Sequence, residues 1–136
     1  MNNFNVNEFV FENEYLFFDA TKFPFIYIKI KESNRKQFED YLCCINTVIL
    51  MKKDYVLLSE LQDTEYMKAE LRKQLDQWVV ENSVHINTFC KGAANVVLDE
   101  EQRILLNHMS KTHSPAYPLF ITDSKEKVEK WLEGRV

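Results

Sequence analysis

Glycine and proline are scarce in this chain, which has 2 glycines and 3 prolines among its 136 residues. Such a sequence leaves little room for flexible linkers or for the glycine-rich loops that bind phosphate groups. A basic stripe is also missing, because charges of both signs are interspersed and the net charge is −4. Nucleic-acid binding needs clustered Lys and Arg to neutralise phosphates, so we expect no nucleic-acid partner.

The sequence also offers little for disulfides, for membrane spans or for metal sites. The three cysteines, two of them adjacent, make a poor disulfide framework: Cys43, Cys44 and Cys90. No apolar run reaches the roughly 18–20 residues that span a bilayer, and "MNNFNVNEF" lacks the features of a secretion signal. No two histidines have His-x-x-x-His spacing. We therefore expect a cytoplasmic protein without membrane insertion, metal or other cofactor.

What the sequence does contain is apolar and aromatic. Hydrophobic residues make up 46% of the chain, with 10 Phe, 6 Tyr and 2 Trp. A chain of this length and composition can bury a core without disulfides or metals. We expect one domain over residues 1–136, with residues 1–7 as a loose N-terminal tail.

Five segments read as strands. "FVFENEYLFF" predicts a hairpin that is broken at Asn13 and Glu14, and "FPFIYIKIK" alternates as a strand with one buried face. "YVLLSEL" is a short apolar run, typical of a central strand covered on both faces. "AANVVL" and "SPAYPLFI" predict the remaining strands.

Helical segments separate these strands. Ser33 can cap the first helix, and Asp63 or Thr64 opens a long second helix that runs as far as Ile86. Asp99 with Gln102 resembles a capping box, and a short helix follows near the end of the sequence. Strands that alternate with helices imply parallel crossovers. The predicted fold is therefore α/β, with a mixed, largely parallel sheet, an N-terminal antiparallel hairpin and about four helices.

Gly92 raises the question of a ligand loop. Phosphate loops and nucleophile elbows lie between a strand and the following helix, whereas Gly92 precedes its strand. We therefore interpret it as a structural turn after the long helix, with Ala93 and Ala94 allowing a helix to pack close to the sheet.

The turn after the predicted central strand is the first candidate site. Ser59, Glu60, Asp63 and Thr64 follow that strand, at the edge where α/β proteins bind ligands. A phosphate on Thr64 would gain from the helix N-terminus but would meet nearby carboxylates. Plain helix capping is the alternative.

The loop "KTHSPAYPLF" is the second candidate, with His113 and Tyr117 as possible contact residues. It can equally serve only to lead the chain into the last strand. An enzyme would need Cys90, His113 or Glu60 to converge in one pocket, whereas a buried thiol at a strand start is the simpler reading. We predict no catalytic residue.

Several blocks resemble the small bacterial SpoIIAA-like proteins of the STAS (STAS/SEC14-like) superfamily. They include "FPFIYIKIK", "YVLLSEL", "CKGAANVV", "PAYPLFIT" and "KVEKWL", within a match from about residue 23 to 132. The resemblance implies a mixed sheet flanked by helices, no catalytic residues and a role in binding. Antagonists of anti-sigma factors in this superfamily switch partners through a phosphorylated Ser in an Asp-Ser-Ser-Gly-type turn. The corresponding "SELQDTEYM" lacks the glycine and the paired serines.

Two functions follow as hypotheses. The first is a non-enzymatic binding or regulatory module that contacts a protein partner through the loops after the strands. The alternative is a carrier or sensor of a small apolar, lipid-like ligand held between the sheet and the aromatic helices. The aromatic N-terminal hairpin further predicts a homodimer, because an edge strand that is apolar on both faces needs a cover.

Overall fold

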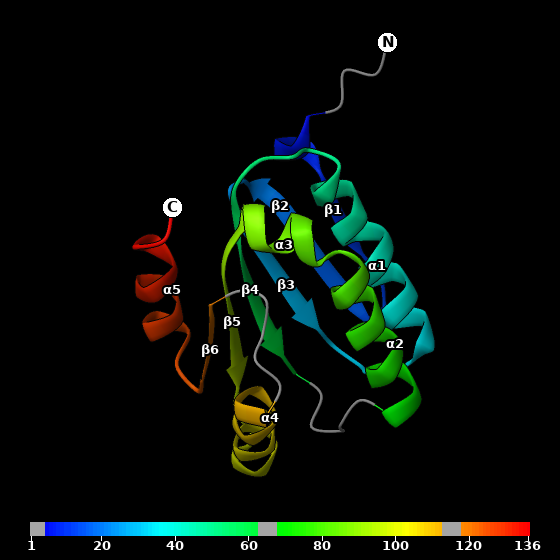
Figure 1. Cartoon of the computed structure of the whole chain (residues 1–136), viewed down its shortest axis with the longest axis vertical. Helices are drawn as coiled ribbons and strands as arrows, with labels where there is room; N and C mark the ends of the chain where they lie inside the picture. Colours follow the sequence, from blue (N-terminus) through cyan, green and yellow to red (C-terminus); the bar gives the residue numbers. More distant parts are fainter. Residues whose placement is uncertain (1–4, 63–67, 113–117) are drawn as a thin grey trace.

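The computed structural model describes residues 5–62, 68–112 and 118–136 and shows an α/β arrangement (Figure 1). Its elements in chain order are η1 (Val6–Glu8), β1 (Val10–Glu12), β2 (Leu16–Lys22), β3 (Phe25–Ile30), α1 (Arg35–Ile49), β4 (Tyr55–Leu61), α2 (Ala69–Glu81), α3 (Ser83–Phe89), β5 (Cys90–Val97), α4 (Glu100–Thr112), β6 (Leu119–Thr122) and α5 (Lys125–Glu133). Within the described ranges, no helix is both long and apolar enough to cross a membrane.

The six strands form one mixed sheet in the order β1-β2-β3-β4-β5-β6. β1, β2 and β3 pair antiparallel, whereas β3, β4, β5 and β6 pair parallel. Each parallel connection leads to the neighbouring strand, and such crossovers are nearly always right-handed, which places their helices on one face of the sheet. The predicted α/β class, with an antiparallel hairpin beside a parallel sheet, is confirmed.

Each face of the sheet carries its own apolar core. On one face, Ile26 and Ile28 of β3 pack with Ile45 of α1 and Ile86 of α3. On the other face, α5 packs over β4 and β5, as seen on the left of Figure 1. β4 has neighbouring residues buried on opposite faces, with Tyr55 in the first core and Val56 in the second. It is the doubly covered central strand that "YVLLSEL" predicts.

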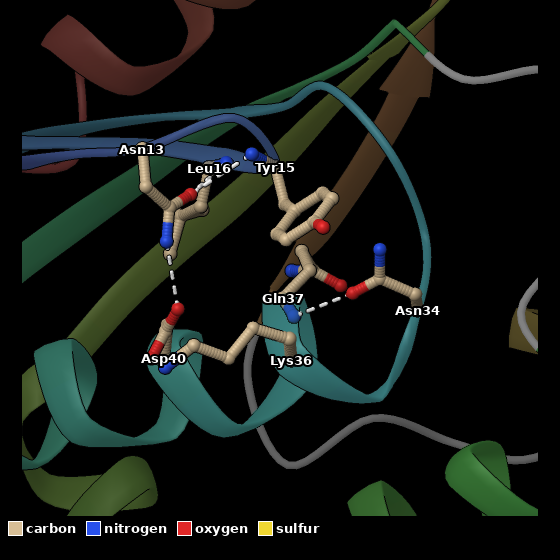
Figure 2. Close-up of polar contacts among 7 residues, drawn as sticks. All are labelled: Asn13, Tyr15, Leu16, Asn34, Lys36, Gln37 and Asp40. Atoms are coloured by element: carbon tan, nitrogen blue, oxygen red, sulfur yellow. Dashed lines mark hydrogen bonds and ion pairs between the residues drawn. The ribbon is translucent and has the colours of Figure 1, made fainter.

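Asn13 closes the N-terminal hairpin and also fastens it to α1 (Figure 2). Its side-chain oxygen accepts hydrogen bonds from the backbone N–H groups of Tyr15 and Leu16 at 2.9 and 3.0 Å. Its amide nitrogen donates to a carboxylate oxygen of Asp40 at 2.8 Å. Asparagine favours such turns because its short side chain replaces a backbone partner. The cap of α1 is Asn34, one residue after the predicted Ser33.

The predicted tail and the predicted long second helix both differ in the structure. Residues 5–7 are not loose: Asn5 caps the short helix η1, and Val6 is only 5% exposed. Residues 1–4 lie outside the described residues. The long helix is divided at Asn82 into α2 and α3, and the Asn82 side chain donates to the Trp78 carbonyl at 2.8 Å. An asparagine that bonds the backbone in this way competes with helix continuation.

Gly92 lies inside β5 and not in a turn, which corrects the sequence interpretation. It pairs with Val56, and its backbone torsion φ is not positive. A Cβ atom at this position would lie 3.1 Å from the Trp131 ring and 2.7 Å from Cδ of Arg135. The glycine is therefore needed because these two side chains approach the strand closely, a reason that no local pattern reveals.

Candidate functional site

A cavity of about 200 Å³ lies between the sheet and the helices α1, α2, α3 and α4. The sheet side of this cavity is built from aligned residues of β4 and β5. Leu57 pairs with Ala93, and Ser59 pairs with Asn95, so all four side chains lie on one face. Two alanine-sized or smaller positions on this face, Ser59 and Ala93, leave room above the sheet.

The helices supply an apolar and aromatic wall to this cavity. α1 contributes Phe38, Tyr41 and Ile45, while α2 contributes Leu75, Trp78 and Val79. These residues recur at helical spacing, which is why each helix turns the same stripe toward the sheet. The wall is the part of the site that the sequence pattern does predict, as an apolar stripe on each helix.

The polar lining residues follow the carboxyl ends of the strands. Ser59 and Asn95 lie near the ends of β4 and β5, Ser33 follows β3, and Gln102 lies on α4 after β5. Tyr55 and Cys90 lie at the opposite, amino ends of the same strands and are buried. The cavity therefore has a polar end and an apolar end, and the polar end is at the edge where α/β proteins bind ligands.

Arg72 is the one charged residue among the described residues that line the cavity. Its Nε atom is buried and has no hydrogen-bond partner in the described part of the chain. An ion-pair contact of 3.4 Å joins Nε to Asp76, whose side chain is 60% exposed, compared with 29% for Arg72. The i,i+4 spacing of Arg72 to Asp76 would by itself suggest an outer face of the helix. Arg72 lies three residues before Leu75, on the border of the apolar stripe of α2. This spacing is the sequence signal that places Arg72 beside the cavity.

Ser59 and Glu60, predicted as parts of one turn, lie on opposite faces of the sheet. Ser59 lines the cavity, whereas Glu60 accepts a hydrogen bond from the hydroxyl group of Tyr27 on the far face. Burial raises the pKa of Tyr27, and the Glu60 carboxylate raises it further. Lys125 lies over the same ring, 4.7 Å from its centroid. The structure thus separates these two candidates, because neighbouring residues of a strand point to opposite faces.

The other four predicted site residues cannot be placed. Asp63 and Thr64 lie outside the described residues, and so do His113 and Tyr117. Nothing in the structure bears on the predicted phosphate switch at Thr64 or on the contact loop.

The two buried cysteine thiols, those of Cys44 and Cys90, are poorly suited to nucleophilic chemistry. Burial raises the pKa of Cys90 to about 11 and that of Cys44 to about 12. Cys90 donates a weak hydrogen bond to the Gly92 carbonyl, with sulfur and oxygen 3.7 Å apart. A thiol must ionise to act as a nucleophile, so both thiols are inert at neutral pH. Within the described ranges, no group of His, Cys, Asp and Glu side chains could hold a metal ion.

A second hollow of about 480 Å³ lies on the far face of the sheet, beside α5. Its lining mixes Phe17 and Tyr27 with charged residues of both signs, such as Lys22, Lys125 and Glu129. Charges of both signs give no net preference for a ligand charge, so the cavity above β4 and β5 is the stronger candidate site.

No protein-family model matches the sequence, and it matches no curated protein and no solved structure. The resemblance to the SpoIIAA-like proteins therefore stays a prediction. The observed α/β class, with a hairpin and a parallel sheet flanked by helices, is consistent with the arrangement that this resemblance implies.

Proposed function

We propose that this protein is a non-enzymatic binding module that holds one small ligand with an apolar body in the cavity above β4 and β5. The observation that supports the proposal is the cavity itself, lined by apolar side chains of the sheet and of four helices and by polar groups at one end. Most ligand sites combine an apolar lining with a few placed polar groups in this way.

The size of the cavity limits the ligand. Drug-sized ligands occupy pockets of about 300–1,000 Å³, and an apolar cavity of about 150 Å³ is enough to bind benzene. A cavity of about 200 Å³ therefore suits a single ring or a short branched chain. A long acyl chain would not fit without movement of the helices, which narrows the lipid-like alternative to small molecules.

Binding is favoured over catalysis because the reactive groups do not converge. Cys90 lines the cavity as a protonated thiol, and Glu60 lies on the other side of the sheet. A nucleophile and its base must lie within hydrogen-bond reach of each other. The described residues that line the cavity include no such pair.

The proposal can be tested with a neutral ring-sized probe. We expect benzyl alcohol to cause saturable amide shifts at Leu57, Ile86 and Ala93 in NMR spectra of the labelled protein. Ser59→Leu fills the cavity from the sheet side and should abolish the shifts. Asn46→Leu, which adds the same side chain at an exposed position of α1, should leave them unchanged.

Folding of each variant is checked by its amide spectrum, and Ala93→Leu replaces Ser59→Leu if the latter does not fold. Absence of saturable shifts in the wild-type protein would refute a ligand-binding function. Identical shifts in a folded, cavity-filled variant would show that the probe binds elsewhere.

A protein partner is the second candidate function, and one observation favours it. Three large apolar side chains in α4 and just before it are exposed: Leu98 is 69%, Ile104 is 61% and Leu105 is 41% exposed. The same helix lines the cavity through Gln102 and Leu106, so a partner bound to α4 would lie next to an occupied site. Exposed apolar side chains that lie close together commonly mark contact surfaces.

Replacing Ile104 and Leu105 with Ser tests this second candidate. We expect a stoichiometric partner purified with the wild-type protein to be lost from the double variant, while benzyl alcohol binding persists. Retention of the partner would exclude this surface. We also propose a cytoplasmic location, supported by three cysteines that are all free: Cys43, Cys44 and Cys90.

A further inference from the structure

Arg72 brings a positive charge to a cavity whose other described lining residues are neutral. A guanidinium group has five N–H donors and stays protonated at all physiological pH values. The buried Nε has no hydrogen-bond partner among the described residues. Buried donors are nearly always paired in proteins, so an unpaired one at a cavity indicates an acceptor that binds there.

Asp76 does not remove this need. Its contact with Nε is 3.4 Å long, it lies one helical turn further along α2, and its side chain is 60% exposed. Exposed ion pairs at this spacing contribute only tenths of a kcal/mol. A ligand anion inside the cavity would interact with Arg72 in a drier environment and would therefore compete well with Asp76.

The surroundings of Arg72 favour an anion in a second way. The polar end of the cavity carries Ser59, Asn95 and Gln102, all neutral groups with hydrogen-bond donors. None of the described lining residues is a carboxylate, so none of them repels a negative charge. The opposite end of the cavity is apolar, with Ile45, Ile86 and Trp78 in its wall.

We propose that the cavity is selective for a small organic monoanion, with a carboxylate bound by Arg72 at the polar end and a ring-sized apolar body packed toward Trp78 and Ile86. This inference rests on the proposed binding function and adds the charge and orientation of the ligand. A carboxylate is the favoured group because its two oxygens match the planar fork of a guanidinium.

Benzoate and benzyl alcohol are the matched probes, because they share the ring and differ in charge. We expect the wild-type protein to bind benzoate at least about tenfold more tightly than benzyl alcohol, a difference of about 1.4 kcal/mol, because a charge-assisted hydrogen bond is stronger than a neutral one. Arg72→Gln should remove this preference and leave benzyl alcohol binding within about twofold. Arg72→Lys should keep part of it.

Arg35→Gln is the control variant. Arg35 also pairs with a carboxylate, that of Glu70 at 2.6 Å, but it does not line the cavity. This variant should bind both probes as the wild-type protein does. Thermal unfolding and amide spectra confirm that each variant is folded, and amide shifts locate the benzoate ring beside Ile86.

The outcomes separate the two proposals. If benzyl alcohol binds in the cavity and benzoate binds no better, the anion proposal is wrong and the binding function stands. If the preference for benzoate survives in folded Arg72→Gln, the anion site lies elsewhere and the proposal is overturned. If neither probe binds, the proposed binding function itself fails.

Discussion

His85 is an ionisable side chain packed between aromatic rings. Its imidazole lies 4.8 Å from the ring of Phe89 and 6.1 Å from that of Tyr55, measured between centroids. The Nε2 atom is buried and has no hydrogen-bond partner in the described part of the chain. Burial lowers the pKa of His85 below its ordinary 6.5, and the charge of Lys52 lowers it further. The folded protein therefore favours the neutral ring.

This pKa predicts a pH-dependent stability. In the unfolded chain His85 takes up a proton near pH 6.5, whereas in the folded chain it does so only at lower pH. Protonation thus favours unfolding, so the contribution of His85 is complete above about pH 6.5 and is lost as the pH falls. Urea unfolding at pH 7.5 and 5.5 should show a smaller decrease in stability for His85→Leu than for the wild-type protein.

His108→Gln is the control for this measurement, because it removes a histidine from an exposed position of α4. The prediction requires that His85→Leu reduce the pH dependence of unfolding more than His108→Gln does. An equal decrease in wild-type and His85→Leu proteins would show that other groups cause the acid sensitivity.

At the scale of elements, the contact between β5 and α5 depends on Gly92. A methyl group there would meet the rigid Trp131 ring at 3.1 Å as well as the flexible Arg135 side chain. Overpacking of this kind typically costs about 1–3 kcal/mol. We expect Gly92→Ala to lower the free energy of unfolding by an amount in that range, measured by urea denaturation.

Gly134→Ala provides the matched comparison. Its Cβ atom would lie 3.8 Å from the nearest atom, a backbone oxygen, in ordinary contact distance. The backbone at Gly134 is right-handed, so alanine should be tolerated without loss of stability. In a double-mutant cycle, Gly92→Ala should cost less stability in a Trp131→Leu background than in the wild-type protein, and an equal cost would place the strain elsewhere.

The elements predicted well are those whose signal is local. The alternation of residues in β3 and the apolar run in β4 predict that both segments are strands and which faces are buried. Asn13 indicates a turn because its side chain can bond the backbone nearby. Gly92 was misread because its reason lies in a helix more than thirty residues away. The division at Asn82 was missed because apolar spacing continues across it, and only a side-chain bond to Trp78 shows the break.

The candidate site was predictable only in part. Ser59 was expected at the carboxyl edge of the sheet, and it lies near the end of β4, because the carboxyl ends of parallel strands are recognisable from the order of elements. The place of Arg72 beside the cavity is hidden in the sequence, because its i,i+4 pairing with Asp76 is typical of a solvated helix surface. Its role depends on the room left by Ser59 and Ala93, which belong to two strands distant in sequence.

At the scale of the whole molecule, the predicted homodimer remains open, and its surface can now be defined. Phe9, Phe11 and Phe18 pack against the core of their own chain, with the rings of Phe9 and Phe18 in edge contact at 5.8 Å. Val10 is the one apolar residue of β1 that is largely exposed, at 49%. The aromatic side chains of the hairpin are therefore covered within their own chain. A second subunit would have only the exposed edge of β1 at Val10 to cover.

Val10→Lys tests the dimer without disturbing the core, because a lysine on an edge strand blocks pairing. We expect a concentration-dependent increase of mass for the wild-type protein in light scattering, and a monomer for the variant. A wild-type monomer at high micromolar concentration would show that the hairpin is covered by its own helices alone.

The consecutive order of the strands bears on how the chain is made. From β2 onward, every strand pairs with the strand synthesised just before it, so none has to be inserted between two that are already joined. A nascent chain can extend the sheet from one edge to the other, and each new strand joins the edge that the preceding strand has just formed. α5 follows all six strands and covers Val56, Leu58, Ala94 and Val96 on the second face. Until that helix emerges from the ribosome, those four side chains form an exposed apolar surface on a sheet that is otherwise assembled. The interval before α5 docks is therefore the one in which the nascent chain is most prone to aggregate and most in need of a chaperone.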